Sequence, residues 1–192
     1  KKNIILIFDE IRSGFRVDLG GAQKKYNVTP DLATFGKAMA NGYSIAALTG
    51  KREILEVYSK KAFITGTYFG NSLSMAAALK TIEFIETNDV ITDLNQKGEY
   101  FKKKMDELIQ NYNNFCEFSG SPWMPYLTFI RDKNEIYKKN REIFFTEMIR
   151  QKVFWQPYHH SYFCYRHTYD DIDYVLTCVE NSLKKILVKN DV

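Results

Sequence analysis

The sequence predicts an α/β fold in its first part, over residues 1–89, followed by a small α+β domain over residues 90–192. The first part opens with an unbroken apolar run at residues 4–8, which is typical of a strand covered on both faces in a parallel sheet. Helical patterns then alternate with further short apolar runs. From residue 115 onward, short strands among helices favour a separate α+β layer.

Each element of the first part has its own pattern. Strands are predicted where apolar or small residues form short runs between turn formers, over residues 4–8, 32–35 and 45–49. Helices are predicted where apolar residues recur at helical spacing, over residues 22–26, 51–59 and 72–86. Asn71 or Ser72 is expected to cap the last of these helices, because a short polar side chain can accept from its unpaired amide groups.

The second part begins with a long amphipathic helix. Its apolar stripe runs over residues 90–112, and we expect this helix to bridge the two domains. Further strands are predicted over residues 115–118, 126–130, 153–155 and 162–165, with a turn at residues 120–122 between the first two. Further helices are predicted over residues 137–151 and 170–188.

The composition is that of a globular protein and argues against several classes of partner. Of the 192 residues, 45% are hydrophobic and 26% are charged, so the chain can bury a core. The 27 basic and 23 acidic residues give a net charge of +4, and the basic ones are scattered, so nucleic acid is not an expected partner. The apolar run at the start is too short for a signal peptide or a membrane span, so a membrane is not expected either.

Cysteine and histidine usage predicts no metal site. The cysteines, Cys116, Cys164 and Cys178, are an odd number without CxxC spacing, so neither a metal cluster nor a disulfide framework is expected. Buried thiols and a reducing cytoplasm fit this usage. His159 and His160 are adjacent and cannot share one face of a strand or helix, which disfavours joint binding of a metal ion.

Lys37 lies among small and apolar residues. Gly36 before it allows another group to approach the backbone closely, and Asn41-Gly42 supplies a turn after it. Poor solvation disfavours the charged form of an ammonium group, so such surroundings favour a nucleophilic amine that can condense with an aldehyde. The alternative is structural and, on this pattern alone, the commoner one: the side chain extends its ammonium group to water.

Two further segments are candidates for a binding site. The run at residues 4–8 ends at Asp9 and Glu10, and parallel sheets bind ligands just beyond the carboxyl ends of their strands. The alternative is an acidic pair that simply ends the strand and faces water. Residues 65–71 form a loop of Gly, Thr and Asn whose hydroxyls and amides can surround an anion, with an ordinary glycine loop as the alternative.

Several short motifs follow one another along the chain: Asp9-Glu10-Ile11, Ser13-Gly14-Phe15-Arg16, Pro30-Asp31-Leu32, Gly36-Lys37, and Gly66-Thr67 ahead of Gly70-Asn71. In this order and spacing they resemble the second half of a class-III pyridoxal-phosphate aminotransferase. The subgroup that looks most similar is glutamate-1-semialdehyde 2,1-aminomutase, on the strength of Gly20-Gly21-Ala22-Gln23 and, near the end, His167-Thr168 with Asp170-Asp171-Ile172-Asp173. The resemblance implies a fold type I enzyme, with the C-terminal part of its large domain over residues 1–89 and a bridging helix and small domain over residues 90–192.

The resemblance also implies pyridoxal 5'-phosphate as the cofactor and gives roles to four residues. Lys37 is expected to form the Schiff base with the cofactor and later to move a proton between substrate and cofactor. Asp9 is expected to pair with the pyridine nitrogen and keep it protonated. Ile11, two residues on in an extended chain, is expected to pack on one face of the ring. Thr67 is expected to donate its hydroxyl to the cofactor phosphate held by the other subunit.

A homodimer with its sites at the subunit interface follows from the same resemblance, as do a small-molecule amino donor and a carbonyl acceptor. Because the chain starts without methionine, almost on a core strand, we interpret it as a fragment that lacks an N-terminal half and need not be active alone. A transaminase is favoured over an aminomutase, because Arg12 and Asn41-Gly42-Tyr43-Ser44 depart from the aminomutase pattern. The alternatives are that aminomutase, a non-catalytic dimerisation fragment, and a cytoplasmic binding module without cofactor.

Overall fold

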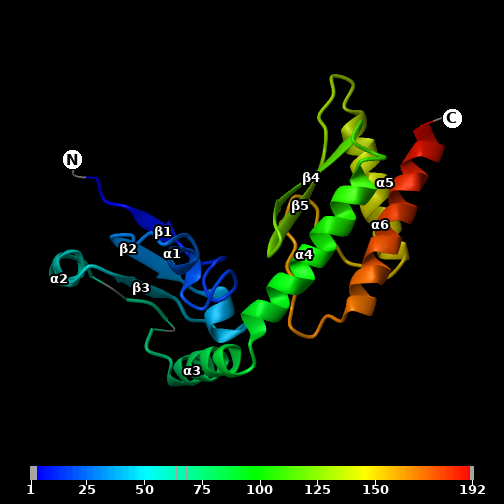
Figure 1. Cartoon of the computed structure of the whole chain (residues 1–192). Helices are drawn as coiled ribbons and strands as arrows, with labels where there is room; N and C mark the ends of the chain where they lie inside the picture. The colour runs from blue at the N-terminus through cyan, green and yellow to red at the C-terminus, as the bar shows by residue number, and fades with distance from the viewer. Residues whose placement is uncertain (1–3, 64, 68, 191–192) are drawn as a thin grey trace. The chain divides into compact units, whose positions relative to one another are not determined.

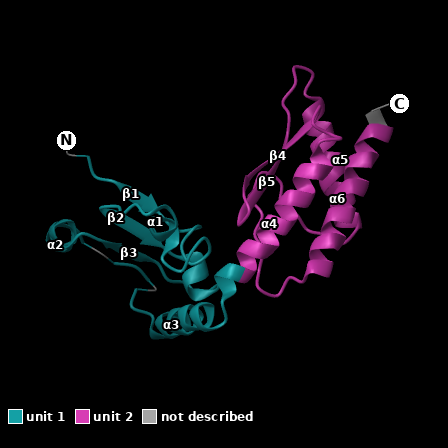
Figure 2. Ribbon diagram, viewed as in Figure 1, with its two compact units in different colours: residues 1–92 teal, residues 93–192 magenta. Residues whose placement is uncertain are grey.

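The computed structural model of the chain describes residues 4–63, 65–67 and 69–190 (Figure 1). The chain forms two compact units, Lys1–Thr92 and Asp93–Val192 (Figure 2). The division lies in the first turn of the long helix α4 (Val90–Ile109), whereas the sequence predicts a domain boundary just before this helix.

Unit 1 contains a three-stranded sheet in the order β1-β2-β3. β1 (Ile7–Asp9) runs parallel to β2 (Leu32–Phe35), and β3 (Ala47–Gly50) runs antiparallel to β2. The strand predicted over residues 32–35 is confirmed with the same bounds, whereas the first and third strands start later than predicted. Because β1 and β2 are parallel, their carboxyl ends lie at one edge of the sheet.

The apolar run that leads into β1 is exposed in this chain, so the prediction that both of its faces are covered is wrong here. Ile4, Ile5 and Ile7 have 74%, 56% and 57% of their surface exposed. Asp31 extends the pairing beyond the ladder, because its Oδ2 accepts a hydrogen bond from Leu6 N–H at 2.7 Å. The apolar pattern predicts the strand, but the described residues of unit 1 do not supply its cover.

The helices of unit 1 are α1 (Gly21–Tyr26), the 3-10 helix η1 (Lys37–Ala40), α2 (Arg52–Lys61) and α3 (Ser72–Thr87). Asn71 caps α3, as predicted, because its Oδ1 accepts a hydrogen bond from Ser74 N–H at 3.0 Å. A small core forms where η1 meets α3, with Met39 and Ala40 packed against Ala78. This contact fixes the turn that carries Lys37.

Unit 2 combines long helices with a β-hairpin. After α4, the strands β4 (Cys116–Ser121) and β5 (Met124–Phe129) pair antiparallel around a turn at Pro122-Trp123, and α5 (Ile136–Arg150) and α6 (Tyr169–Asn190) follow. The helices α5 and α6 pack side by side (Figure 1). The core contains many large buried side chains, among them Phe101, Met105, Phe144, Met148, Val179 and Leu183.

Two of the predicted strands in unit 2 are wrong. Residues 153–155 and 162–165 contain no strand and belong to an irregular segment between α5 and α6. Trp155 and Phe163 in this segment are 8% and 9% exposed, so its apolar residues fill the core without forming a sheet. The segment is attached to β5 by a backbone hydrogen bond, which Ser161 N–H donates to Pro125 O at 2.9 Å. Burial of single aromatic residues in a loop thus imitates the pattern of a short strand.

The thiols differ in their surroundings. Cys116 and Cys178 are buried, as predicted, whereas Cys164 is exposed on the irregular segment, so the prediction of burial is wrong for this residue. Burial raises the pKa of the Cys116 thiol to about 12. This thiol therefore stays protonated at neutral pH and behaves as a small apolar side chain.

Candidate functional site

The carboxyl ends of β1 and β2 bring Asp9 and Lys37 to the same edge of the sheet. Asp9 is the last residue of β1 and lies opposite Thr34 of β2, and Lys37 follows the end of β2 by two residues. Side chains that bind ligands in α/β proteins gather at this kind of edge.

One carboxylate oxygen of Asp9 is held by hydrogen bonds within the chain, and the other is available to a ligand. Its Oδ1 accepts hydrogen bonds from Ile11 N–H at 3.1 Å and from the Thr34 hydroxyl at 3.3 Å. Within the described part of the chain, no hydrogen bond reaches Oδ2. The side chain is exposed, so an N–H group of a ligand can approach this second oxygen.

Lys37 starts η1 in a strained conformation. Its φ of 44° lies in the left-handed region, which costs a residue other than glycine about 1–2 kcal/mol. Strain of this kind is common at functional sites, where the surrounding packing maintains it. The Lys37 side chain is exposed, so the prediction of a poorly solvated ammonium group is wrong for this chain. The reason is that its apolar neighbours Met39 and Ala40 pack into the core and not around the amine.

Ile11 packs against the backbone just before Lys37. A Cβ atom on Gly36 would lie 3.3 Å from Ile11 Cδ1, so the glycine allows this close approach. Residues 11–16 form turns, so the prediction that Ile11 continues β1 as an extended residue is wrong. Ile11 nevertheless stays at the edge of the sheet, because its N–H donates to Asp9. Three predicted site residues, Asp9, Ile11 and Lys37, therefore come together at this edge.

Glu10 is a residue beside the site to which the sequence patterns give no separate role. Its side chain is 1% exposed, whereas that of Asp9 next to it is exposed. Its Oε2 accepts from the Ser13 hydroxyl at 2.5 Å, and its Oε1 accepts from Gln23 N–H at 3.2 Å. Gly21, with a φ of 73°, makes room, because a Cβ there would lie 2.6 Å from Glu10 Oε1. Glu10 thereby ties the turn after β1 to α1, and Gly21 at the start of α1 is the sequence signal that could have indicated it.

Thr67 lines a pocket of unit 1 to which the other three predicted site residues do not contribute. The loop predicted over residues 65–71 is described except for residue 68, which lies outside the described residues. Thr67 is exposed and lines an open pocket of about 690 Å³ with Ser44 and Asn71, and Asp9, Ile11 and Lys37 are not part of that lining. The structure of this chain therefore does not bring Thr67 together with the other three residues.

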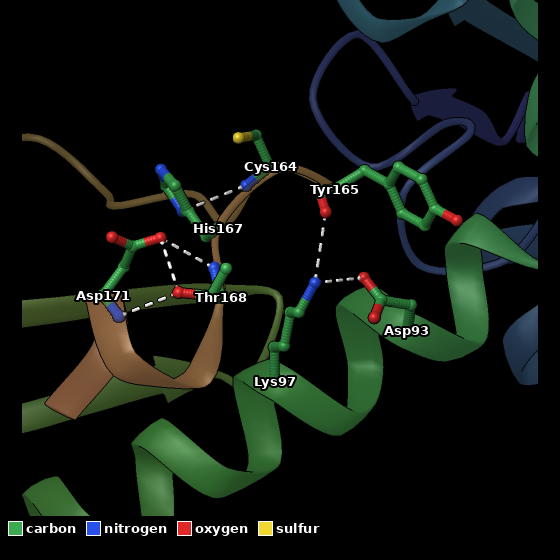
Figure 3. Close-up of polar contacts among 7 residues, drawn as sticks. All are labelled: Asp93, Lys97, Cys164, Tyr165, His167, Thr168 and Asp171. Atoms are coloured by element: carbon green, nitrogen blue, oxygen red, sulfur yellow. Dashed lines mark hydrogen bonds and ion pairs between the residues drawn. The ribbon is translucent and has the colours of Figure 1, made fainter.

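In unit 2, the His167-Thr168 motif and the acidic residues after it form a helix cap (Figure 3). Thr168 donates to Asp171 Oδ2 through its N–H at 2.8 Å and through its hydroxyl at 2.9 Å. Asp171 N–H donates back to Thr168 Oγ1 at 3.1 Å, which completes a reciprocal capping box at the start of α6. The hydrogen bonds from Thr168 lower the pKa of the Asp171 carboxyl. The capping of α6 therefore gives this motif a structural role.

Lys97 ties the segment before α6 to α4. Its side chain is nearly buried, and its Nζ lies 2.7 Å from Asp93 Oδ2 and donates to Tyr165 O at 3.1 Å (Figure 3). The same Nζ lies 5.6 Å from the centroid of the Tyr165 ring. On the other side of this turn, Cys164 N–H donates to His167 Nδ1 at 3.3 Å. The turn over residues 164–167 is thus held from both sides.

The part of the chain that the structure describes contains neither a candidate metal centre nor a candidate membrane span. No group of three or more His, Cys, Asp or Glu side chains in those ranges is placed to hold a metal ion. No helix within them is both long and apolar enough to cross a bilayer.

The sequence matches one protein family and a set of curated relatives. The sequence model of the family "Aminotransferase class-III" matches residues 1–145. A protein of Cloacimonas acidaminovorans named 3-aminobutyryl-CoA aminotransferase is 50% identical over 182 residues, which are 95% of this chain and 44% of that protein. Glutamate-1-semialdehyde 2,1-aminomutase 2 of Lachnoclostridium phytofermentans is 34% identical over 196 residues, which are 96% of this chain and 46% of that protein. The chain thus spans less than half the length of these relatives.

Two solved structures share the fold of this chain. The FumI protein of Sphingopyxis sp. MTA144, described as its PLP internal aldimine form, superposes with a TM-score of 0.86 at 25% identity and covers 97% of this chain and 44% of that chain. An omega-transaminase from Sphaerobacter thermophilus superposes with a TM-score of 0.81 at 19% identity and covers 95% of this chain and 44% of that chain. At such identity, the second likeness shows the fold alone.

Proposed function

The chain belongs to the class-III aminotransferase family, and we propose that the whole protein transfers amino groups with the help of pyridoxal 5'-phosphate. The family match and the solved structures confirm the resemblance and the fold class predicted from the sequence, the C-terminal part of a fold type I large domain followed by a small α+β domain. The observation that carries the proposal is the juxtaposition of Asp9, Ile11 and Lys37 at the ends of two neighbouring parallel strands.

The residues at this edge fit the cofactor. Asp9 offers Oδ2, which accepts no hydrogen bond within the described part of the chain, to a protonated pyridine nitrogen. Ile11 offers an apolar side chain beside Gly36 for one face of the ring. Lys37 offers an exposed amine on a turn that the core holds in place. When bound, the cofactor supplies an electron sink and a carbonyl group that takes up the amino group.

Lys37 has two tasks in the proposed mechanism. Its Nζ is the covalent attachment point for the cofactor aldehyde. Once substrate has displaced it, the same Nζ would take the proton from the amino-bearing carbon of the substrate and pass it to the aldehyde carbon of the cofactor. Base catalysis of this kind contributes roughly 10²–10⁴-fold to a rate. Asp9, oriented by Ile11 N–H and by the Thr34 hydroxyl, meanwhile holds the proton on the pyridine nitrogen.

Thr67 serves the neighbouring subunit of a homodimer in this proposal. Its exposed hydroxyl lines a pocket to which Asp9 and Lys37 do not contribute, so it is available to a phosphate group held by a second copy. Met75 of the adjacent helix α3 lines the same pocket and is 45% exposed, and Leu79, one turn further along the same face, is 71% exposed, which gives this side of unit 1 an apolar surface for a partner to cover. Thr67→Val in the full-length enzyme should weaken cofactor binding by about 1.5–3 kcal/mol, the value of a hydrogen bond to a charged group. Thr65→Val is the matched control, and equal cofactor affinity of the two variants would contradict the assignment.

The transfer is intermolecular, and the amino donor is a coenzyme A thioester of a β-amino acid. In support, the relative named for 3-aminobutyryl-CoA is 50% identical to this chain, and the relative named as an aminomutase is 34% identical. Transfer within one molecule of glutamate-1-semialdehyde is the second candidate, because several relatives named for that reaction align over 95–97% of the chain. We propose a cytoplasmic location, because the three cysteines are free and a reducing compartment keeps thiols in that state.

The test uses the full-length enzyme with cofactor. One reaction contains 3-aminobutyryl-CoA and a 2-oxo acid, and the other contains glutamate-1-semialdehyde without an acceptor. We expect the 2-oxo acid to become an amino acid in the first reaction and no isomerisation in the second. Isomerisation without an acceptor would favour the aminomutase, and no conversion in either reaction would favour a non-catalytic scaffold. Lys37→Ala should abolish the conversion, whereas Lys24→Ala, a control on the surface of α1, should leave it unchanged.

A further inference from the structure

A pocket of about 370 Å³ lies inside unit 2, between the irregular segment after α5 and the start of α6. Its floor is aromatic, because Phe101, Trp155 and Phe163 line it and are each less than 10% exposed. The ring centroids of Phe101 and Trp155 are 6.2 Å apart, and those of Phe101 and Phe163 are 5.3 Å apart, so the floor is a packed cluster. The volume is in the range of sites for small molecules.

The pocket is built in advance by contacts of the irregular segment with the rest of unit 2. Ser161 N–H donates to Pro125 O at 2.9 Å, which attaches the segment to β5. Lys97 donates to Tyr165 O at 3.1 Å, which attaches its later part to α4. A ligand would therefore not have to order this segment before it binds, and preorganisation of this kind favours affinity.

The charge of the lining selects the kind of ligand. Asp171 is the one charged residue among the described residues that line the pocket, and no lysine or arginine is among them. Both hydrogen bonds from Thr168 go to Asp171 Oδ2, and Figure 3 shows the other oxygen turned away from Thr168. These hydrogen bonds lower the pKa of the Asp171 carboxyl, which keeps it ionised at neutral pH. A carboxylate on a lining that has no lysine or arginine disfavours phosphates and carboxylates as ligands.

The other aromatic and histidine residues of the lining also favour a cation as the ligand. All three histidines of the chain line the pocket, and so do Phe154 and Tyr162. The ring centroids of His159 and Tyr162 are 6.0 Å apart, and those of His167 and Phe163 are 6.4 Å apart, so the rim continues the aromatic floor. The faces of aromatic rings attract organic cations, and a nearby carboxylate strengthens that attraction.

We propose that this pocket binds a small organic cation, with its ammonium group beside Asp171 and its apolar part against the aromatic floor. None of Asp9, Ile11, Lys37 and Thr67 lines this pocket, because all four belong to unit 1. The proposal therefore stands or falls independently of the proposed enzymatic activity.

The test compares two probes of the same shape by isothermal titration into the full-length enzyme with its cofactor. Choline is a quaternary ammonium ion, so it cannot condense with the cofactor aldehyde, and 3,3-dimethylbutan-1-ol is its uncharged counterpart. We expect choline to bind at least about fivefold more tightly than the alcohol, which is the factor for one charge pair near contact distance in water. Equal binding of the two probes, or no binding of choline, would overturn the proposal.

Matched variants locate the binding. Asp171→Asn should weaken choline binding at least about fivefold and leave binding of the alcohol unchanged, because the amide keeps the shape of the cap and loses the charge. Asp170→Asn removes the same charge from the neighbouring residue, which does not line the pocket, and should leave choline binding unchanged. Equal effects of the two substitutions would overturn the assignment. Phe154→Ala provides a second variant that should fold, because this side chain is 79% exposed, and unchanged choline binding in it would count against the aromatic contribution.

Discussion

Replacing Glu10 by alanine should release the turn that carries Ile11. The substitution removes the acceptor for two hydrogen bonds, from the Ser13 hydroxyl and from Gln23 N–H, in a position that is 1% exposed. Each hydrogen bond to a charged group contributes about 1.5–3 kcal/mol, so the lower value for both gives about 3 kcal/mol. Local opening of the turn and of the start of α1 should then become about a hundredfold more frequent.

Hydrogen exchange of the full-length protein, read by mass spectrometry, measures this opening. The amides of Gly14 and Gln23 report it, because they donate to the backbone and to the side chain of Glu10. Glu10→Gln keeps the shape and should have a smaller effect, and Glu53→Gln on the exposed helix α2 should have none. Cofactor affinity should fall in the order of the exchange rates, because Ile11 is in the released turn. Wild-type exchange at both amides in Glu10→Ala would refute this reasoning.

Two further predictions concern unit 2. The hydrogen bonds from Thr168 lower the pKa of the Asp171 carboxyl in the folded protein. They therefore stabilise the start of α6 at pH values above the pKa of an unfolded Asp, which is about 4. This stability is lost as the pH falls through the pKa of the folded state. The melting temperature should therefore fall less steeply from about pH 5 to about pH 3 in Asp171→Asn than in the wild type, and parallel slopes would contradict the role of the cap. Asp93→Ala leaves the Lys97 ammonium, whose side chain is 8% exposed, without its carboxylate, and should cost about 3 kcal/mol. Lys97→Met leaves a carboxylate that is 32% exposed and should cost less, so the reverse order in thermal denaturation would contradict this account.

Elements that depend on local chemistry could be predicted from the sequence. The strand β2 has the predicted bounds, and Asn71 caps α3 as expected, because apolar runs and capping side chains act over a few residues. The placement of Asp9 and Lys37 at one edge also follows from local features, since Asp9 ends β1, Lys37 follows the end of β2 and the two strands are parallel. The roles of both residues at the cofactor stay predictions.

Features that depend on tertiary packing could not be predicted. The solvation of Lys37 depends on Met39 and Ala40 packing against α3, which the spacing of apolar residues along the chain does not reveal. The burial of Glu10 depends on the approach of Gly21, which lies eleven positions further along the chain. The irregular segment at residues 153–165 has apolar residues because they fill a core between helices, and a short apolar run cannot distinguish that environment from a strand.

The attachment of the cofactor to Lys37 can be measured directly. The full-length enzyme is incubated with pyridoxal 5'-phosphate and reduced with borohydride, and the modified peptide is identified by mass analysis. We expect the reduced adduct on Lys37, and we expect Lys37→Ala to retain some cofactor through Asp9 and the phosphate contacts but to yield no such adduct. An adduct on another lysine, with Lys37 unmodified, would contradict the proposed role of Lys37.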